Sequence, residues 1–273
     1  MTLRETLRDL TPPLLQRTVR KVLGRGLRFE GDYASWAEAS AASGGYDTED
    51  IVRRVNDAEM KVARGEAVDA RDGVLFDTMQ FCLPVMAALM RAAARRGGAL
   101  RVVDFGGAFG GLFRQYKALG VPGAIDWTVV EQPKFAAMGA AQFQNAELRF
   151  AASLDEALAA NPPDVILLSS VIQYLPEPHS LIRRLVEAGA AHMIIDRTPC
   201  SELERDVLTV QTVPPSIYPA SYPCWIFARH RLVGSFAPGY RLWAQFTDST
   251  GQWSATATRF ELAGFIFDQQ SAS

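Results

Sequence analysis

The spacing of hydrophobic positions changes near residue 98. Before that point apolar side chains recur at helical intervals, which predicts a helix beginning at Ser35, one over 47–64 and one over 73–96 with a kink at Pro84. After it, short apolar runs alternate with helical stretches. We expect strands at 100–105, 127–130, 148–150, 165–168, 193–195, 240–246 and 260–267. We expect helices at 110–119, 133–141, 153–160 and 179–189.

The pattern after residue 98 indicates the fold class. Runs of four to six apolar residues are typical of strands buried on both faces of a parallel sheet. Alternation of strands and helices predicts a doubly wound, mostly parallel α/β sheet. The last two strands are separated only by a polar turn, so we expect them to be antiparallel. We therefore divide the chain into a basic amphipathic segment (1–28), a helical cap region (29–98) and an α/β domain (99–273).

Composition and charge narrow the function classes. The chain is 48% hydrophobic with a net charge of −2, which excludes intrinsic disorder and disfavours nucleic acid as a partner. The segment 1–28 differs, since it holds seven basic and two acidic side chains, a net charge of +5. Such a segment can lie on an anionic membrane surface, or pack on the domain with its basic face in water. Both alternatives stay open.

The cysteines and the longest apolar runs indicate in which cellular compartment we expect the protein. Cys82, Cys200 and Cys224 lie far apart, and no cysteine and histidine spacing suggests a metal site. Reduced thiols and a cytoplasmic location are therefore expected. No apolar run approaches the 18 residues of a transmembrane helix, so any contact with the inner membrane would be peripheral and through 1–28.

A glycine-rich turn carries the most specific chemical signal. The stretch VVDFGGAFGG over 102–111 follows a predicted strand and opens a predicted helix. Glycines at a strand tip let a ligand approach the backbone, and ligands of open α/β sheets bind at the carboxyl ends of strands. Glu131 ends the next predicted strand, where a carboxylate can hold ribose hydroxyls. These features together predict an adenosine-type pocket.

Asp104 and Ala108 discriminate between the ligands that such a pocket could bind. A dinucleotide site follows G-x-G-x-x-G, but Ala108 stands where its middle glycine would be. Asp104 would repel a pyrophosphate, whereas its carboxylate suits a cationic sulfonium ligand. The pattern D-x-G-x-A-x-G over 104–110 resembles the first motif of class I S-adenosylmethionine-dependent methyltransferases, in which D/E-x-G-x-G-x-G is usual.

The resemblance extends beyond this motif. The stretch DVILLSSVIQYLPEP over 164–178 resembles the fourth-strand region of the same family. Over 29–268 the chain also resembles a small methyltransferase family associated with bacterial surface-polysaccharide loci, through segments such as Gly31-x-Tyr33-x-x-Trp36 and Asp196-Arg197-Thr198-Pro199. The resemblance implies a Rossmann-like, seven-stranded sheet with an antiparallel last strand. It also implies S-adenosylmethionine as cofactor and a small-molecule or glycan acceptor, in surface-polysaccharide biosynthesis.

The resemblance also implies which residues contact the cofactor. They belong to the glycine turn and to the ends of the next three strands: Asp104, Gly106, Ala108, Gly110, Glu131, Ser153, Ser169 and Ser170. Ser153 has an equally good alternative as a helix cap, because Glu156 follows three residues later.

Candidates for the acceptor side lie near the ends of the fourth and fifth strands. Methyl transfer to oxygen or nitrogen can need a general base, for which His179 and Asp196 are candidates. The alternatives are a solvent-exposed histidine at a helix start for His179, and an ion pair with Arg197 or a helix cap for Asp196. Tyr174 would contact substrate or fill the core.

A proline-rich and aromatic stretch over 211–227 fits neither the helical nor the strand spacing of apolar residues, so we expect a substrate loop there. We expect this loop and the cap region to cover the acceptor, through Tyr33, Arg71, Tyr218 and Tyr222.

Two other functions remain as alternatives. One is a cofactor-binding protein without catalysis, and the other, disfavoured by Asp104 and Ala108, is a nicotinamide-dependent oxidoreductase.

Overall fold

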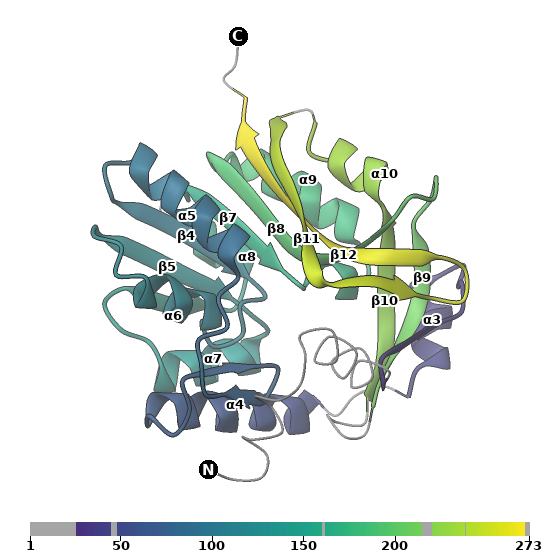
Figure 1. Ribbon diagram of the computed structural model, residues 1–273, viewed down its shortest axis with the longest axis horizontal. Helices are drawn as coiled ribbons and strands as arrows, with labels where there is room; N and C mark the ends of the chain where they lie inside the picture. Colours follow the sequence, from purple (N-terminus) through teal and green to yellow (C-terminus); the bar gives the residue numbers. More distant parts are fainter. Residues whose placement is uncertain (1–25, 45–47, 160–161, 215–219, 238, 271–273) are drawn as a thin grey trace, which may run out of the picture.

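A mixed β-sheet with helices on both faces forms the body of the molecule (Figure 1). The computed structural model describes residues 26–44, 48–159, 162–214, 220–237 and 239–270. Within these residues the main sheet has ten strands, and a separate hairpin has two.

The centre of the main sheet follows the expected doubly wound plan. Its parallel strands are β4 (Leu100–Phe105), β5 (Ile125–Val130), β6 (Leu148–Ala151), β7 (Val165–Ser169) and β8 (His192–Ser201). They lie in the order β6-β5-β4-β7-β8. β12 (Arg259–Gln269) then pairs antiparallel with β8, and β11 (Tyr240–Ser254) pairs antiparallel with β12. The seven expected strands and the antiparallel last strand are confirmed, but the sheet is not limited to seven strands, because three more described below extend it to ten.

Two helical layers cover the sheet because successive side chains of a buried strand point to opposite faces. One layer consists of α5 (Leu83–Arg95), α6 (Gly111–Ala118) and α7 (Pro133–Gln142). The other consists of α8 (Leu154–Ala159), α9 (Pro178–Ala188) and α10 (Arg229–Gly234).

Neighbouring residues of β4 pack against opposite helical layers. Val102 packs with α5 and α6, whereas Val103 packs with α8 and α9. Each such fully buried aliphatic side chain stabilises the fold by about 1.5–3 kcal/mol.

The region 29–98 is helical only in part. It contains α3 (Trp36–Ala42) and α4 (Thr48–Ala63), and the short strands β1 (Arg28–Glu30), β2 (Asp69–Arg71) and β3 (Val74–Phe76). The expected helix over 73–96 is therefore wrong in its first turns. Pro84 lies in the first turn of α5 and starts that helix instead of kinking it, because its missing N–H has no intrahelical partner there.

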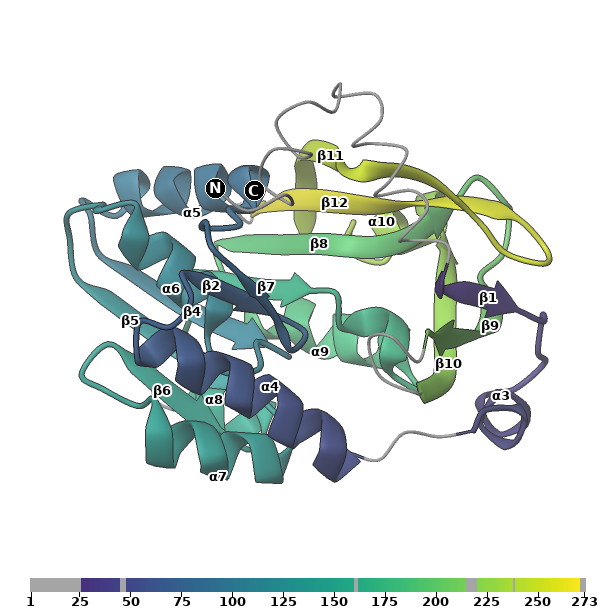
Figure 2. The ribbon, with the colours of Figure 1, turned by 60° about the horizontal axis from the view of Figure 1, so that its bottom comes forward.

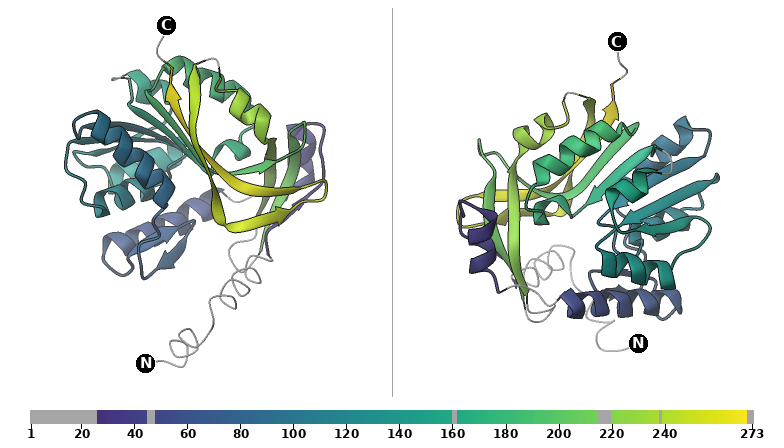
Figure 3. Two further views of the ribbon diagram at one scale, coloured as in Figure 1. Left: turned by 45° about the horizontal axis from the view of Figure 1, so that its top comes forward. Right: turned by 180° about the vertical axis from the view of Figure 1, so that it is seen from behind.

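The stretch 211–227 was expected to be a loop, but most of it is strand. β9 (Val207–Val213) and β10 (Ala220–Ala228) form an antiparallel pair, and β1 adds to the outer edge of β9. Figure 3 shows this extension from two sides, with α3 packed against it. Pro223 is tolerated in β10 because β10 pairs with β8 only at Phe227 and Ala228, leaving one edge at Pro223 without a strand partner in the described chain.

Among the residues described, no helix has both the length and the apolar character needed to span a membrane. The amphipathic segment 1–28 lies outside the described residues apart from its last three.

Candidate functional site

The glycine turn connects the end of β4 to α6 and packs closely on its surroundings. Gly106 has φ +76°, and a Cβ there would lie 2.4 Å from Cγ2 of Val171, in the segment after β7. A Cβ on Gly107 would lie 2.4 Å from Oδ2 of Asp104. Glycine is therefore required at both positions by the close approach of neighbouring groups.

Ala108 links the turn to the end of β5. Its φ of +49° lies in the left-handed region, which costs an L-residue roughly 1–2 kcal/mol. Its N–H donates to Oε1 of Glu131 at 3.2 Å, and the N–H of Gln132 donates to Oε2 at 2.9 Å. Burial raises the pKa of Glu131, an effect that these two N–H groups partly offset. Gly110, with φ +84°, caps the start of α6.

Asp104 lies fully buried beneath this turn. Its Oδ2 accepts a hydrogen bond from Nε1–H of Trp127 at 3.2 Å, while Oδ1 has no partner among the described residues. Burial raises the pKa of Asp104 to about 7. In this conformation the carboxylate supports the turn from below and does not reach solvent, so direct contact with a cofactor stays a prediction.

The end of β7 and the neighbouring middle part of β8 bring three predicted residues together. The hydroxyl of Ser169 donates to Oδ2 of Asp196 at 2.9 Å, and the N–H of Ser170 donates to the Asp196 carbonyl at 2.9 Å. Asp196 is buried and forms an ion pair with Arg197. Sγ of Cys82 lies 3.5 Å from Oδ2 of Asp196, and burial raises the pKa of this thiol to about 12, so it stays neutral and can donate.

A β-bulge places Asp196 and Arg197 beside the same neighbour. In the pairing of β8 with β12, Thr198 opposes Ala263 and Ile195 opposes Phe265, so Asp196 and Arg197 together oppose one residue. Arg197 has φ +50°, and Nη2 of its guanidinium donates to Oγ of Ser169 at 3.1 Å. The bulge thus lets two consecutive side chains contact Ser169, whereas a regular strand would send them to opposite faces.

Backbone strain and unpaired polar atoms gather at this edge of the sheet. Of the four non-glycine residues with positive φ in the described chain, three lie here: Ala108, Ser170 and Arg197. The same edge holds three buried polar atoms that lack a hydrogen-bond partner there: Oδ1 of Asp104, Oε1 of Gln173 and Nε of Arg197. Strained residues and unsatisfied buried groups concentrate at functional sites, so we assign the candidate site to the carboxyl ends of β4, β5 and β7 and the part of β8 beside the end of β7.

Two predicted tyrosines come together next to this edge. The hydroxyl of Tyr174 donates to Oε1 of Gln211 at 3.1 Å, and Nε2 of Gln211 lies 3.4 Å from the hydroxyl of Tyr222. The two rings pack edge to face, with centroids 5.2 Å apart.

The other acceptor-side predictions are not joined to this pair. Tyr33 packs with Trp36 and Leu208 against β9, and Nη2 of Arg71 donates to the Gln80 carbonyl at 2.9 Å. Tyr218 lies outside the described residues. A role for these three residues in binding the acceptor stays a prediction.

His179 and Ser153 have contacts that explain them without a ligand. The ring nitrogens of His179 lie 3.1 Å from Oγ of Ser235 and 2.8 Å from Oδ2 of Asp206, which ties α9 to α10 and to the start of β9. Oγ of Ser153 accepts from the N–H of Glu156 at 3.2 Å, which supports the helix-cap alternative. Their proposed roles toward base catalysis and the cofactor stay predictions.

Sequence reasoning did not assign Gln173, Trp127 or the bulge at Arg197 to the site. Trp127 falls in an apolar run, and nothing in the sequence marks its indole N–H as the partner of Asp104. The bulge depends on pairing with β12, more than sixty residues further along the chain. Gln173 lies within the stretch that resembles the fourth-strand region, which is the signal that could have indicated it.

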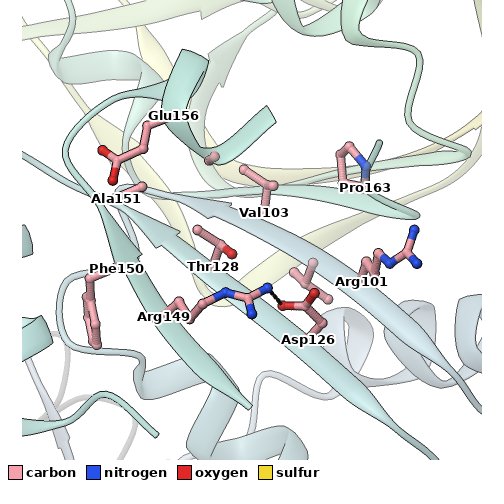
Figure 4. A pocket seen from close by; sticks show the side chains of 11 residues that line it. Arg101, Val103, Asp126, Thr128, Arg149, Phe150, Ala151, Glu156 and Pro163 are labelled. Carbon is pink, nitrogen blue, oxygen red and sulfur yellow. Dashed lines mark hydrogen bonds and ion pairs between the residues drawn. The ribbon is translucent and has the colours of Figure 1, made fainter. Parts of the chain in front are cut away.

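A cavity of about 200 Å³ lies elsewhere, on the face of β4, β5 and β6 beside α8. Figure 4 shows its charged lining, with Arg149 paired to Asp126 and Arg101 nearby. These three side chains belong to the first half of their strands, away from the carboxyl ends. The polar cluster described above does not line this cavity, so we do not place the functional site there.

Comparison with known proteins gives structural likeness alone. No protein-family model matches the chain, and no curated protein is significantly similar to it. The N-terminal domain of EvdMO1 with S-adenosylhomocysteine bound is 14% identical, with a TM-score of 0.48, over 83% of this chain and 98% of that one. The N-methyltransferase NodS from Bradyrhizobium japonicum is 14% identical, with a TM-score of 0.44, over 80% and 99%. The 1,6-didemethyltoxoflavin-N1-methyltransferase from Burkholderia thailandensis is 14% identical, with a TM-score of 0.42, over 84% and 95%.

Proposed function

We propose that this chain is an S-adenosylmethionine-dependent methyltransferase whose cofactor binds at the carboxyl ends of β4, β5 and β7. The observation that carries the proposal is the contact between Glu131 and the N–H of Ala108, in a turn that packs on buried Asp104 at Gly107. The site thus combines a tight glycine turn, a carboxylate at the end of the next strand and a second carboxylate beneath the turn. This combination suits a ribose and a cationic sulfonium better than a pyrophosphate.

The residues present fit this cofactor. Gly106 and Gly107 leave no space for a Cβ, so the turn can pack closely, and Oδ1 of Asp104 is a buried acceptor without a partner in the described chain. Glu131 would hold the ribose hydroxyls, and Ser169 and Ser170 would flank the methionine portion. When bound, S-adenosylmethionine supplies a methyl group already activated by its sulfonium.

The chain's own part is to orient the acceptor, exclude water and remove a proton. Holding nucleophile and methyl group in line can account for much of the rate enhancement. Asp196 is the better-placed base, because its buried carboxylate contacts Ser169 at the end of β7. His179 contacts Asp206 and Ser235 instead. Tyr174 and Tyr222 are the candidates for contact with the acceptor.

For the acceptor itself we propose a small molecule or a glycan, methylated in the cytoplasm during surface-polysaccharide biosynthesis. Support comes from the sequence resemblance over 29–268 and from the neighbouring aromatic and amide side chains of Tyr174, Gln211 and Tyr222. The +5 charge of residues 1–28 supports contact with an anionic inner membrane.

Calorimetric titration tests the cofactor. Wild-type protein should bind S-adenosylmethionine and S-adenosylhomocysteine but not NADH. Glu131→Ala should weaken binding by about 10- to 100-fold, because a hydrogen bond to a charged group contributes roughly 1.5–3 kcal/mol. Glu147→Ala, which removes a surface carboxylate paired with Lys117, is the matched control and should leave affinity unchanged. NADH binding, or equal affinities for wild type and Glu131→Ala, would contradict the proposal.

A further inference from the structure

We propose that Gln173 and Arg197 form a subsite for a neutral hydroxyl group of the acceptor, such as that of a sugar ring. The inference rests on the proposed function and names the chemical class of its acceptor. Gln173 belongs to the single-turn helix η2 (Ile172–Tyr174) after β7, and Arg197 to the bulge of β8. Gln173 therefore follows the end of β7, and Arg197 lies in the adjacent strand β8 next to the residue that pairs with that end.

Gln173 presents an unused hydrogen-bond acceptor. Its side chain is buried, with the residue 1% exposed, and Nε2 donates to Oγ of Ser170 at 3.1 Å and to the Arg197 carbonyl at 3.4 Å. The carbonyl can only accept, so the amide orientation is fixed. Oε1 must then point away from Arg197's carbonyl, and it has no partner among the residues described.

Arg197 presents a buried donor without a hydrogen-bond partner in the described chain. Nη2 donates to Oγ of Ser169, whereas Nε lies 3.3 Å from Oδ2 of Asp196 in an ion pair without forming a hydrogen bond. A buried donor and a buried acceptor, each without a hydrogen-bond partner among the described residues, thus belong to two residues that are in contact through Nε2 of Gln173 and the Arg197 carbonyl. Arg197 and Ser170 both have positive φ. Strained residues next to buried polar groups without partners are typical of ligand-binding sites.

Charge selects the ligand group that these two atoms can bind. A carboxylate or phosphate on Nε of Arg197 would lie beside the carboxylate of Asp196, which would repel it. An ammonium group has only donors, so it cannot accept a hydrogen bond from Nε of Arg197. A hydroxyl both donates and accepts and carries no charge, so it can use either atom without repulsion.

The surroundings of Gln173 are suited to the same class of ligand. Tyr174 follows it in the chain, and the Gln211 amide lies between the hydroxyls of Tyr174 and Tyr222. Aromatic faces beside neutral amides provide both apolar contact and hydrogen bonds for a polyhydroxylated ring. We infer that the acceptor enters along this side of η2.

Saturation-transfer NMR titration, with S-adenosylhomocysteine present, tests the inference. The probes are the neutral methyl glycosides of glucose, galactose and mannose, with methyl glucuronide and methyl glucosaminide as the anionic and cationic counterparts. Wild type should bind at least one neutral glycoside more tightly than both charged probes. Gln173→Leu and Arg197→Lys should each weaken it about tenfold, as expected for losing one hydrogen bond. The absence of any preference for neutral probes would overturn the inference.

Two further sets of variants separate the loss of a direct contact from the loss of folding. Gln173→Asn keeps both the acceptor oxygen and the donor amide group and should retain more glycoside binding than Gln173→Leu, while the surface variants Gln144→Leu and Arg184→Lys should match wild type. Unfolding temperatures like that of wild type in both Gln173 variants exclude misfolding as the cause of the loss in Gln173→Leu. Equal losses in both Gln173 variants, with unfolding temperatures like that of wild type, would overturn the inference.

The cofactor itself provides the last control. Methylthioadenosine lacks the amino-acid end of S-adenosylhomocysteine, so the two ligands report on different parts of the pocket. If Gln173→Leu and Arg197→Lys lower affinity for S-adenosylhomocysteine but not for methylthioadenosine, both residues bind the amino-acid end and the inference is wrong. A wild-type protein that binds neither nucleoside contradicts the proposed function itself, which distinguishes the two failures.

Discussion

Ala108 occupies a backbone conformation that favours glycine. Its φ is +49°. Replacing this alanine by glycine should stabilise the protein, because glycine adopts the left-handed region without a steric cost. We expect Ala108→Gly to raise the free energy of unfolding by about 0.5–1 kcal/mol in urea titration. Ala137→Gly, at an exposed position of α7, is the control and should lower it by about 1 kcal/mol. Destabilisation by Ala108→Gly would show that the methyl group has packing contacts that outweigh the strain.

Asp104 should make stability depend on pH. Its folded-state pKa of about 7 lies above the ordinary value of 3.8, so between these values the folded protein binds more protons than the unfolded chain. The free energy of unfolding therefore falls as pH rises from about 4 to 7, by roughly 4 kcal/mol from this group.

Asp104→Asn removes this titration while an amide oxygen can still accept from Trp127. The variant should gain stability relative to wild type as pH rises from 5 to 8, measured by denaturant titration at each pH. A constant difference between the two proteins across this range would exclude an elevated pKa for Asp104.

At the scale of elements, one arginine joins three segments of the chain. Nη1 of Arg114 on α6 donates to Glu59 of α4 at 2.6 Å, and Nη2 donates to Asp69 of β2 at 3.0 Å. Both carboxylates are buried. Val52 of α4 packs with Phe109 of the glycine turn, and Figure 2 shows α4 alongside α7 and β2. Arg114 thus fixes the position of α4 and the hairpin relative to the turn.

Removing this arginine leaves two buried carboxylates facing each other. Arg114→Met should lower the free energy of unfolding by about 3–5 kcal/mol in denaturant titration. Lys117 lies on the same helix and forms an exposed pair with Glu147, so Lys117→Met should cost less than about 1 kcal/mol. Equal effects of the two changes would mean that α4 does not depend on Arg114.

Elements were predictable from sequence where local pattern determines them. The strands β4 to β8 each contain a short apolar run, and the glycine turn and Glu131 mark their own positions, so both the strands and the turn were identified. The hairpin of β2 and β3 was missed although Asp72-Gly73 is a typical two-residue hairpin signal, because its strands have only three residues. β10 was missed because Pro223 interrupts its strand pattern. The pairing of Asp196 and Arg197 with β12 creates the bulge, so no local pattern could predict it.

For the whole molecule, residues 1–25 should be dispensable for cofactor binding. The candidate site is formed by the ends of β4, β5 and β7 and the part of β8 beside the end of β7, which all follow this segment by more than 75 residues. A protein beginning at Gly26 retains β1, and calorimetry should give it the full-length affinity for S-adenosylhomocysteine. It should no longer pellet with anionic vesicles at low salt. A tenfold loss of cofactor affinity would place the segment in the pocket.

The pairing of β1 with β9 has a consequence for the order of folding. Arg28 lies opposite Thr212, so the partner of an early strand is synthesised 184 residues later. At about 5–20 residues per second, the ribosome needs roughly 10–40 s to make the chain between them. Throughout that interval β1 has no strand to join, and closing so long a loop is an entropic cost that the finished extension must offset. The outer edge of the extension is therefore expected to form last and to exchange its amide hydrogens sooner than β4 or β7.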